Sequence, residues 1–224
     1  ARCAWGGGET PTLTGIVQAD TVVLAGSAIG IIRPKGRLIR ADVRAGDVIV
    51  LLESSGIHAN GLTLARAIAD QAPDGYLTPL RDGRTYGESL LDPTHVYVGL
   101  IEDCLDRGIE IHYAVNITGH GWRKLMRAPG SFAYVIERVP PPHPVFEFMQ
   151  AHGHIDDREA YGNFNMGAGF AIYVPERDVN AVLDIARAFP FKALEAGHIE
   201  ESDTKRVVIA PKGLEYAGET LAVR

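Results

Sequence analysis

The sequence predicts an α/β fold in which helices cover a mixed β-sheet. Short β-branched or alternating segments are interleaved with segments whose apolar residues recur at the helical spacing. The two kinds of segment alternate imperfectly, which favours a mixed sheet over a strictly parallel one. The 224 residues, of which 46% are hydrophobic and 22% charged, are sufficient for one large or two small globular domains.

Glycine, proline and polar turns divide the chain into the expected elements. The predicted strands are 21–32, 41–52, 109–117, 132–136, 164–174, 193–199 and 206–209. The predicted helices are 62–72, 90–107, 145–151, 155–161 and 175–188, with a glycine turn and a further helix over 118–126. The tail, 212–224, is expected to pair as a terminal hairpin. Strand 21–32 is expected to pair with a part of the protein outside this chain or with a second copy of the chain.

Composition excludes several classes of partner. The net charge is −6 and the basic residues are scattered, so we expect no nucleic-acid partner and no binding to anionic lipid. No apolar run approaches the roughly 20 residues of a membrane span. Cys3 and Cys104 are too few for a disulfide framework or a zinc site, which favours a reducing cytoplasm. Cys104 lies on an apolar helix face and is predicted to be a core residue.

The most informative stretch is the loop 54–61, with the sequence Ser-Ser-Gly-Ile-His-Ala-Asn-Gly. It connects an apolar strand to a helical pattern. Unpaired N–H groups in the first turn of a helix favour an anion, and the two glycines let the backbone come close to it. The alternative interpretation is an ordinary strand-to-helix connection in which Ser54 or Asn60 caps the helix.

Two further glycine segments accompany this loop. A second strand runs into the turn 118–121, and two such loops in one α/β domain can converge at one end of a sheet, where ligands bind. His120 in that turn is alternatively an ordinary exposed residue. Near the N-terminus, three glycines precede Glu9, so a ligand could approach closely there. The alternative there is a flexible loop with a solvated carboxylate.

Five motifs then occur in a fixed order, at 6–10 (Gly-Gly-Gly-Glu-Thr), 54–61, 90–98, 117–121 and 163–169. Together they resemble the phosphoribosylformylglycinamidine cyclo-ligase (AIR synthase) family from residue 1 to about residue 210. The resemblance implies a C-terminal domain of three α/β/α layers with a mixed sheet over residues 42–224. Residues 1–41 would then be a remnant of the N-terminal ATP-binding and dimerisation domain. Because the chain opens on Ala rather than Met, we expect it to be a fragment or one half of a split protein.

The resemblance also implies an activity. Family members close formylglycinamidine ribonucleotide to aminoimidazole ribonucleotide in purine biosynthesis. ATP phosphorylates the amide oxygen, which turns it into a leaving group, and the nearby amine then attacks. The implied cofactors are ATP and magnesium, the implied location is the cytoplasm and the implied assembly is a homodimer. The family's Lys and Asp residues for ATP and magnesium lie upstream of the Gly-Gly-Glu motif and have no counterpart in this chain.

The resemblance assigns candidate roles to individual residues. His58 and Glu9 are the expected catalytic residues, His58 because an imidazole titrates near working pH. Glu9 is in addition a candidate magnesium ligand. The expected substrate- and phosphate-binding residues are Ser54, Ser55, Gly56, Asn60, Gly61, Thr118, Gly119, Gly121, Asn165 and Gly167.

Two departures keep alternatives open. Asn116 stands where the family commonly has His, and His120 where it has Gly. A related ATP-dependent enzyme of the superfamily with another substrate would satisfy the same glycine pattern. A further alternative is a binding or assembly module without catalysis, since the upstream ATP residues are absent. In either case we expect the 224-residue chain alone to be inactive.

Overall fold

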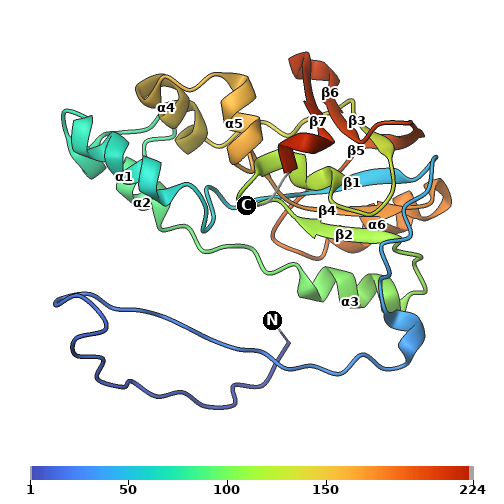
Figure 1. Ribbon diagram of the computed structural model, residues 1–224, viewed down its shortest axis with the longest axis horizontal. Helices are drawn as coiled ribbons and strands as arrows, with labels where there is room; N and C mark the ends of the chain where they lie inside the picture. The colour runs from blue at the N-terminus through green and yellow to red at the C-terminus, as the bar shows by residue number, and fades with distance from the viewer. Residues whose placement is uncertain (1, 222–224) are drawn as a thin grey trace. The chain divides into compact units, whose positions relative to one another are not determined.

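The computed structural model describes residues 2–221, and the chain divides into two compact units, Ala1–Leu38 and Ile39–Arg224. Within the larger unit, a seven-stranded sheet has the order β2-β4-β1-β5-β3-β6-β7 (Figure 1). Only β3 and β6 pair in parallel, and all other neighbours are antiparallel. The predicted mixed sheet is therefore confirmed. The strands are β1 Val48–Glu53, β2 Tyr113–Asn116, β3 Phe132–Ile136, β4 Ala168–Val174, β5 Ala193–Glu201, β6 Arg206–Ile209 and β7 Leu214–Ala217.

Helices pack on both faces of this sheet. They are α1 Leu62–Gln71, α2 Tyr86–Leu90, α3 Val98–Asp106, α4 Pro144–Gly153, α5 Asp157–Asn163 and α6 Val179–Ala186. Side chains of α1, α2, α4 and α5 form one apolar core with the sheet, and those of α3 and α6 form the other. Strand β1 contributes Ile49 and Leu51 to the first core and Val50 and Leu52 to the second, because successive side chains of a strand point to opposite faces. The α/β/α layering that the resemblance implied is confirmed.

Cys104 lies in the second core and is fully buried, as the sequence predicts. Burial raises the pKa of its thiol to about 11, so the thiol stays protonated and unreactive at neutral pH.

The predicted helix 90–107 is wrong in its first half. Helix α2 starts earlier, at a capping box in which Thr85 and Glu88 bond each other's backbone N–H, and it ends at Leu90. The chain then runs without regular structure to Val98, where α3 begins. Pro93 causes the break, because its ring disfavours helical geometry at the preceding residue.

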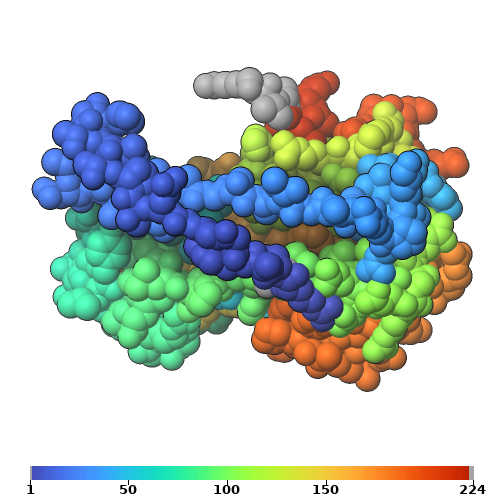
Figure 2. Space-filling model, turned by 90° about the horizontal axis from the view of Figure 1, so that it is seen from below, coloured from blue at the N-terminus to red at the C-terminus, as the bar shows by residue number. Residues whose placement is uncertain are grey.

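The predicted strand 21–32 is also wrong. Within the smaller unit, the described regular structure is one isolated bridge between Thr14 and Val17 and a 3₁₀ turn at Lys35–Arg37. The β-branched side chains of this stretch are exposed, with Ile29 at 99%. A strand requires a neighbour for its backbone hydrogen bonds, and no other strand lies in this unit among the described residues. In the space-filling view the same segment, in blue, is a narrow run of chain (Figure 2).

Smaller differences concern element ends. Strands β2 and β4 are shorter than predicted, and the helix expected after the second glycine turn is a 3₁₀ helix, Gly121–Met126. Helix α6 is preceded by a 3₁₀ turn, Glu176–Asp178. The terminal hairpin is confirmed by the antiparallel pairing of β6 with β7, while residues 222–224 lie outside the described residues. None of the helices within residues 2–221 combines the length and apolarity that a membrane crossing requires.

Strand pairing positions the loops of interest. The end of β1 at Glu53 pairs with the start of β4 at Ala168. The end of β2 at Asn116 pairs with Phe170, near the same end of β4. Three loops therefore meet at one end of the sheet, namely residues 54–61 after β1, 117–121 after β2 and 163–167 before β4.

Candidate functional site

Asn165 holds the loop junction together. Its side chain is 2% exposed, and its Oδ1 accepts hydrogen bonds from Ser54 Oγ at 2.9 Å and from Gly167 N–H at 3.0 Å. Its Nδ2 donates to the carbonyl oxygens of Gly56 at 2.8 Å and Ile57 at 3.3 Å. One amide thus fixes the first loop to the start of β4. Asn165 was expected to face the substrate, but its polar atoms are engaged inside the protein.

The predicted glycines allow the loops to approach one another. A Cβ on Gly61 would lie 2.4 Å from the Phe164 ring, and one on Gly121 would lie 2.3 Å from the Tyr161 carbonyl oxygen. A Cβ on Gly167 would lie 2.9 Å from the Pro141 carbonyl oxygen. All three glycines also have left-handed φ angles, which side chains rarely adopt. These three glycines therefore allow close packing of protein against protein, and the predicted approach of an anion to Gly61 stays a prediction.

Neither proposed cap operates at the start of α1. The N-cap is Gly61, which makes no side-chain cap. Ser54 Oγ is bonded to Asn165, and Asn60 Nδ2 donates to the Asn163 carbonyl oxygen at 2.8 Å. Asn60 also lies against the second loop, because its Oδ1 is 3.1 Å from the position of a Cβ on Gly119. The structure thus places the two predicted glycine loops in direct contact.

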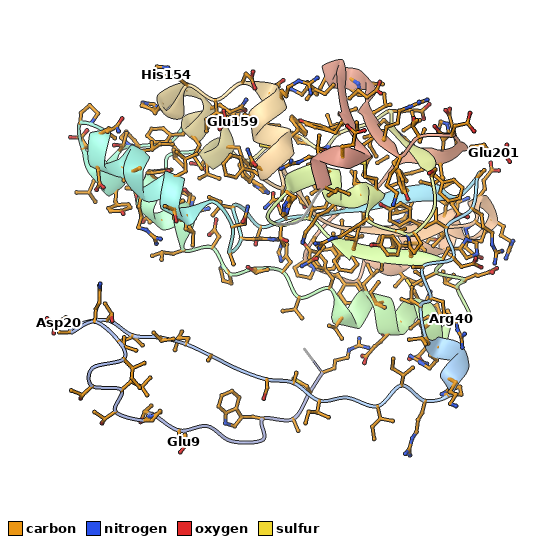
Figure 3. All side chains as sticks on the ribbon, viewed as in Figure 1. Glu9, Asp20, Arg40, His154, Glu159 and Glu201 are labelled. Carbon is orange, nitrogen blue, oxygen red and sulfur yellow. The ribbon has the colours of Figure 1, made fainter. Side chains whose placement is uncertain are left out.

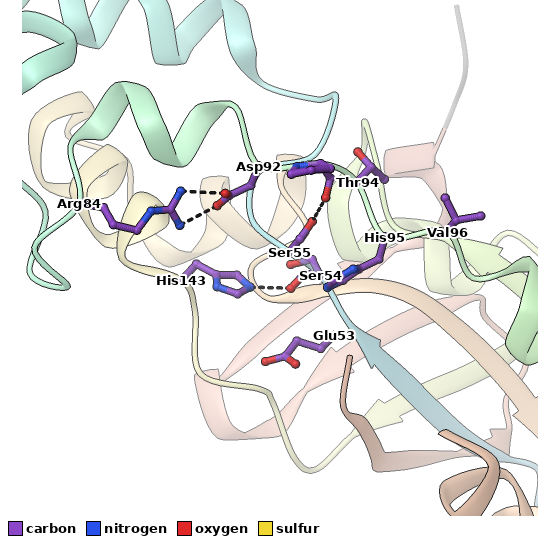
Figure 4. Close-up of a pocket in the computed structure, with 10 residues that line it drawn as sticks. Glu53, Ser54, Ser55, Arg84, Asp92, Thr94, His95, Val96 and His143 are labelled. Carbon is purple, nitrogen blue, oxygen red and sulfur yellow. Dashed lines mark hydrogen bonds and ion pairs between the residues drawn. The ribbon is translucent and has the colours of Figure 1, made fainter. Parts of the chain in front are cut away.

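An open pocket of about 480 Å³ adjoins the first loop (Figure 4). Its lining comes from the end of β1 and the loop that follows, the turn before α2, the segment between α2 and α3, and the segment before α4. The lining residues are Glu53, Ser54, Ser55, Arg84, Asp92, Pro93, Thr94, His95, Val96 and His143. Of the residues predicted from sequence, Ser54 and Ser55 lie in this lining.

Internal bonds order the pocket walls. Arg84 binds Asp92 through two hydrogen bonds of 2.9 and 2.7 Å, which raise the pKa of the guanidinium (Figure 4). Ser55 Oγ donates to the Pro93 carbonyl oxygen at 2.6 Å. His143 Nε2 lies 2.7 Å from the Ser54 carbonyl oxygen, which can only accept, so this nitrogen carries the proton. The walls are thus fixed before any ligand enters.

His58 is 9% exposed and lies beside the pocket residue His95, with the two ring centroids 6.5 Å apart. Its Nε2 accepts a hydrogen bond from the Ser55 N–H at 3.1 Å, so that nitrogen is unprotonated. Burial, with smaller contributions from His95 and His143, lowers the pKa of His58 to about 4. The expectation that His58 titrates near working pH is therefore wrong, because the fold keeps the ring neutral. A catalytic role for His58 stays a prediction.

His95 presents an imidazole to the pocket itself. Its ring packs against Phe191 at 5.3 Å between centroids and against Tyr97 at 6.3 Å. Burial lowers the pKa of His95, and the Glu53 carboxylate opposes that shift. His95 is therefore predominantly neutral at neutral pH and can accept a proton. Glu53 also lines the pocket, and its backbone carbonyl oxygen accepts a hydrogen bond from the Tyr97 hydroxyl at 2.8 Å.

The second loop has its own polar centre. Lys124, which is 7% exposed, bonds the Thr118 hydroxyl and lies 3.4 Å from Asn116 Oδ1. The family departure at Asn116 therefore places an amide oxygen beside a buried ammonium. His120 has a left-handed φ of 78° and is half-buried.

Glu9 belongs to the smaller unit, where it is exposed (Figure 3). Its predicted contact with substrate or magnesium stays a prediction. Within residues 2–221, no group of three or more His, Cys, Asp or Glu side chains is arranged to hold a metal ion.

Sequence reasoning missed Glu53, Arg84, Asp92, His95 and His143. The motif 90–98 contains Asp92 and His95, but the resemblance assigns them no role. The others come from segments far apart in the chain, so their convergence follows from the packing and not from any local pattern.

Comparisons with known proteins agree with this architecture. A family model described as AIR synthase related protein, C-terminal domain, matches residues 44–210. The phosphoribosylformylglycinamidine cyclo-ligase of Methanocaldococcus jannaschii is 40% identical over 198 residues, which cover 88% of this chain and 56% of that protein. The protein of the same name from Methanopyrus kandleri is 39% identical over 203 residues, covering 87% and 56%. The chain thus spans just over half the length of these relatives.

Two solved structures have a similar fold. PurL of T. maritima, complexed with FGAR, gives a TM-score of 0.53 at 15% identity, covering 84% of this chain and 30% of that one. The hydrogenase maturation protein HypE of E. coli gives 0.52 at 18% identity, covering 83% and 53%. At these identities the likeness shows the fold alone.

Replacing Asn165 by Ala should lower the free energy of unfolding by at least about 2 kcal/mol, because several buried polar groups lose their partner. Chemical denaturation of the chain measures this change. Asn180→Ala, on the exposed side of α6, is the matched control and should shift stability by less than about 0.5 kcal/mol. Equal effects of the two substitutions would contradict the assigned role of Asn165.

The depressed pKa of His58 predicts a pH dependence. Between pH 4 and 6.5 the unfolded chain binds a proton at His58 that the folded chain does not, so stability is lost as pH falls through this window. Relative to pH 7.5, the His58 contribution at pH 5 should be a loss of about 2 kcal/mol.

Denaturation of wild type and His58→Asn at the two pH values isolates this contribution. Asn tolerates the left-handed φ of 58° at this position and does not titrate. The variant should lose less stability on acidification than wild type. The same loss in both proteins would show that His58 is not held neutral by the fold.

Proposed function

The chain belongs to the AIR synthase related protein family, whose C-terminal domain it carries, and from this premise we propose that it is the C-terminal part of an ATP-dependent phosphoribosylformylglycinamidine cyclo-ligase. The observation that carries the proposal is the 40% identity to the M. jannaschii relative over 88% of this chain. The proposed reaction converts formylglycinamidine ribonucleotide to aminoimidazole ribonucleotide in purine biosynthesis.

The pocket supports this proposal through its chemistry. Ring closure requires an amine to be held close to an activated amide carbon and to lose a proton as it attacks. The predominantly neutral His95 ring and the Glu53 carboxylate both line the pocket and can accept a proton. Ser55 and Thr94 contribute hydroxyls that can orient the amidine and amide nitrogens. We assign the reacting part of the substrate to this pocket.

ATP would supply the phosphoryl group that makes the amide oxygen a leaving group. We place its binding residues, and most magnesium ligands, in the length of the relatives that this chain does not match. Glu9 remains the residue that we propose this chain contributes to magnesium or substrate binding. The exposed segment 21–32 supports the proposed homodimer, because this apolar, β-branched stretch has no neighbouring strand within the described residues 2–38 and is suited to pairing. The proposed location is the cytoplasm.

A second candidate is a related ATP-dependent enzyme of the superfamily with another substrate. The contact of Asn116 with Lys124 favours it, because the second loop then differs chemically from the usual family pattern. A non-catalytic binding or assembly module is the third candidate.

The parent protein, meaning the longest natural polypeptide that contains these residues, tests the proposal. It should form aminoimidazole ribonucleotide from formylglycinamidine ribonucleotide and ATP. His95→Asn should lower kcat/KM by roughly 100-fold, which is typical for loss of a general base. His154→Asn is the control, since His154 is exposed and occupies a left-handed helix end that Asn tolerates.

Two outcomes separate the candidates, and a third tests the role of His95. Turnover of another substrate with ATP, but not of this one, would contradict the cyclo-ligase proposal and favour the related enzyme. No turnover of any candidate substrate would favour the non-catalytic module. An unchanged rate in His95→Asn would remove His95 from the mechanism.

A further inference from the structure

Lys124 is a buried cation whose contacts are with neutral groups. It lies in the 3₁₀ helix Gly121–Met126 directly after the second glycine loop, and its side chain crosses to the end of β2. The Nζ atom donates to the Thr118 hydroxyl and to Asn116 Oδ1. An ammonium has three protons to donate, so one remains for a further partner.

No carboxylate compensates this charge among the residues that the structure describes. Burial lowers the pKa of Lys124, and Arg127, another cation, lowers it further. Lys212 provides the contrast, because its Nζ lies 3.0 Å from the Asp157 carboxylate. A buried charge without a counter-charge is costly, and an incoming anion would remove that cost.

The surroundings of Lys124 are suited to such an anion. Asn116 and Arg127 are exposed, and Thr118 and Gly119 are half-buried, so the polar groups around the ammonium reach the surface. Arg127 adds a second positive charge in a chain whose net charge is −6. The site also adjoins the first loop, because Asn60 packs against Gly119.

We propose that Lys124, with Thr118, Asn116 and Arg127, forms a binding site for a phosphate group. The assignment rests on the proposed function, in which a ribonucleotide and ATP both carry phosphate. The proposed phosphate site therefore lies at the second loop and not at loop 54–61, where the sequence placed phosphate-binding residues. The Ser54, Ser55 and Asn60 side chains of loop 54–61 are hydrogen-bonded within the protein. The second loop retains a charged donor that can bind an anion.

Calorimetric titration of the full 224-residue chain with ribose 5-phosphate, and separately with ATP, tests the site. Lys124→Met should weaken phosphate binding at least roughly tenfold, as expected for loss of a charge-assisted hydrogen bond. Lys212→Met, which removes a lysine already paired with Asp157, should bind as wild type does. Without ligand, Lys124→Met should melt no lower than wild type, because it removes an uncompensated buried charge.

Arg127→Gln is a second variant at an exposed position, where folding is not at risk, and it should weaken binding by a smaller factor. Lys124-dependent binding of ribose 5-phosphate assigns the site to the ribonucleotide, and Lys124-dependent binding of ATP alone assigns it to the nucleotide. Absence of binding to wild type, or equal affinity in Lys124→Met, would overturn the proposal. Because binding requires no turnover, this outcome is independent of whether the parent is a cyclo-ligase.

Discussion

The side-chain amide of Asn165 is the interaction on which the rest of the site depends. It receives two hydrogen bonds and donates two, and its own backbone carbonyl accepts from Trp122 Nε1 at 2.8 Å. The loop after β1, the segment before β4 and the 3₁₀ helix after the second loop are therefore tied to one residue. Antiparallel pairing of β1 with β4 brings these segments to the same end of the sheet, and the amide fixes how they meet there.

This junction determines the chemistry available on its surface. Neighbouring protein atoms fill the space where side chains would lie at Gly61, Gly121 and Gly167, so the loops pack closely. Most polar side chains of the first loop are hydrogen-bonded within the protein. Burial keeps His58 neutral, whereas the neighbouring His95 lines the pocket. Functional groups free to act on a ligand are consequently found beside the predicted loop, in the pocket wall and at Lys124.

Local patterns predicted most of the fold because strand and helix periodicity, and breaks at Gly and Pro, are local properties. The split of helix 90–107 was also readable, since Thr85 and Glu88 form a capping box and Pro93 follows. Strand 21–32 shows the limit of such patterns, because β propensity does not supply a pairing partner. The three loops singled out in the sequence do lie together at one end of the sheet. The sequence could not separate residues that hold the loops together, such as Asn165, from residues that line the pocket, such as His95, because that distinction depends on long-range packing.

We propose that a ribonucleotide binds where the three loops meet, with its reacting part in the pocket and its phosphate at Lys124. The most direct test is an amide NMR titration of the 224-residue chain with formylglycinamidine ribonucleotide. Binding there should shift amide signals mainly in residues 53–58, 92–97 and 116–124, all at one end of the sheet. Shifts confined to α3 and α6, or no shifts under saturating ligand, would contradict it.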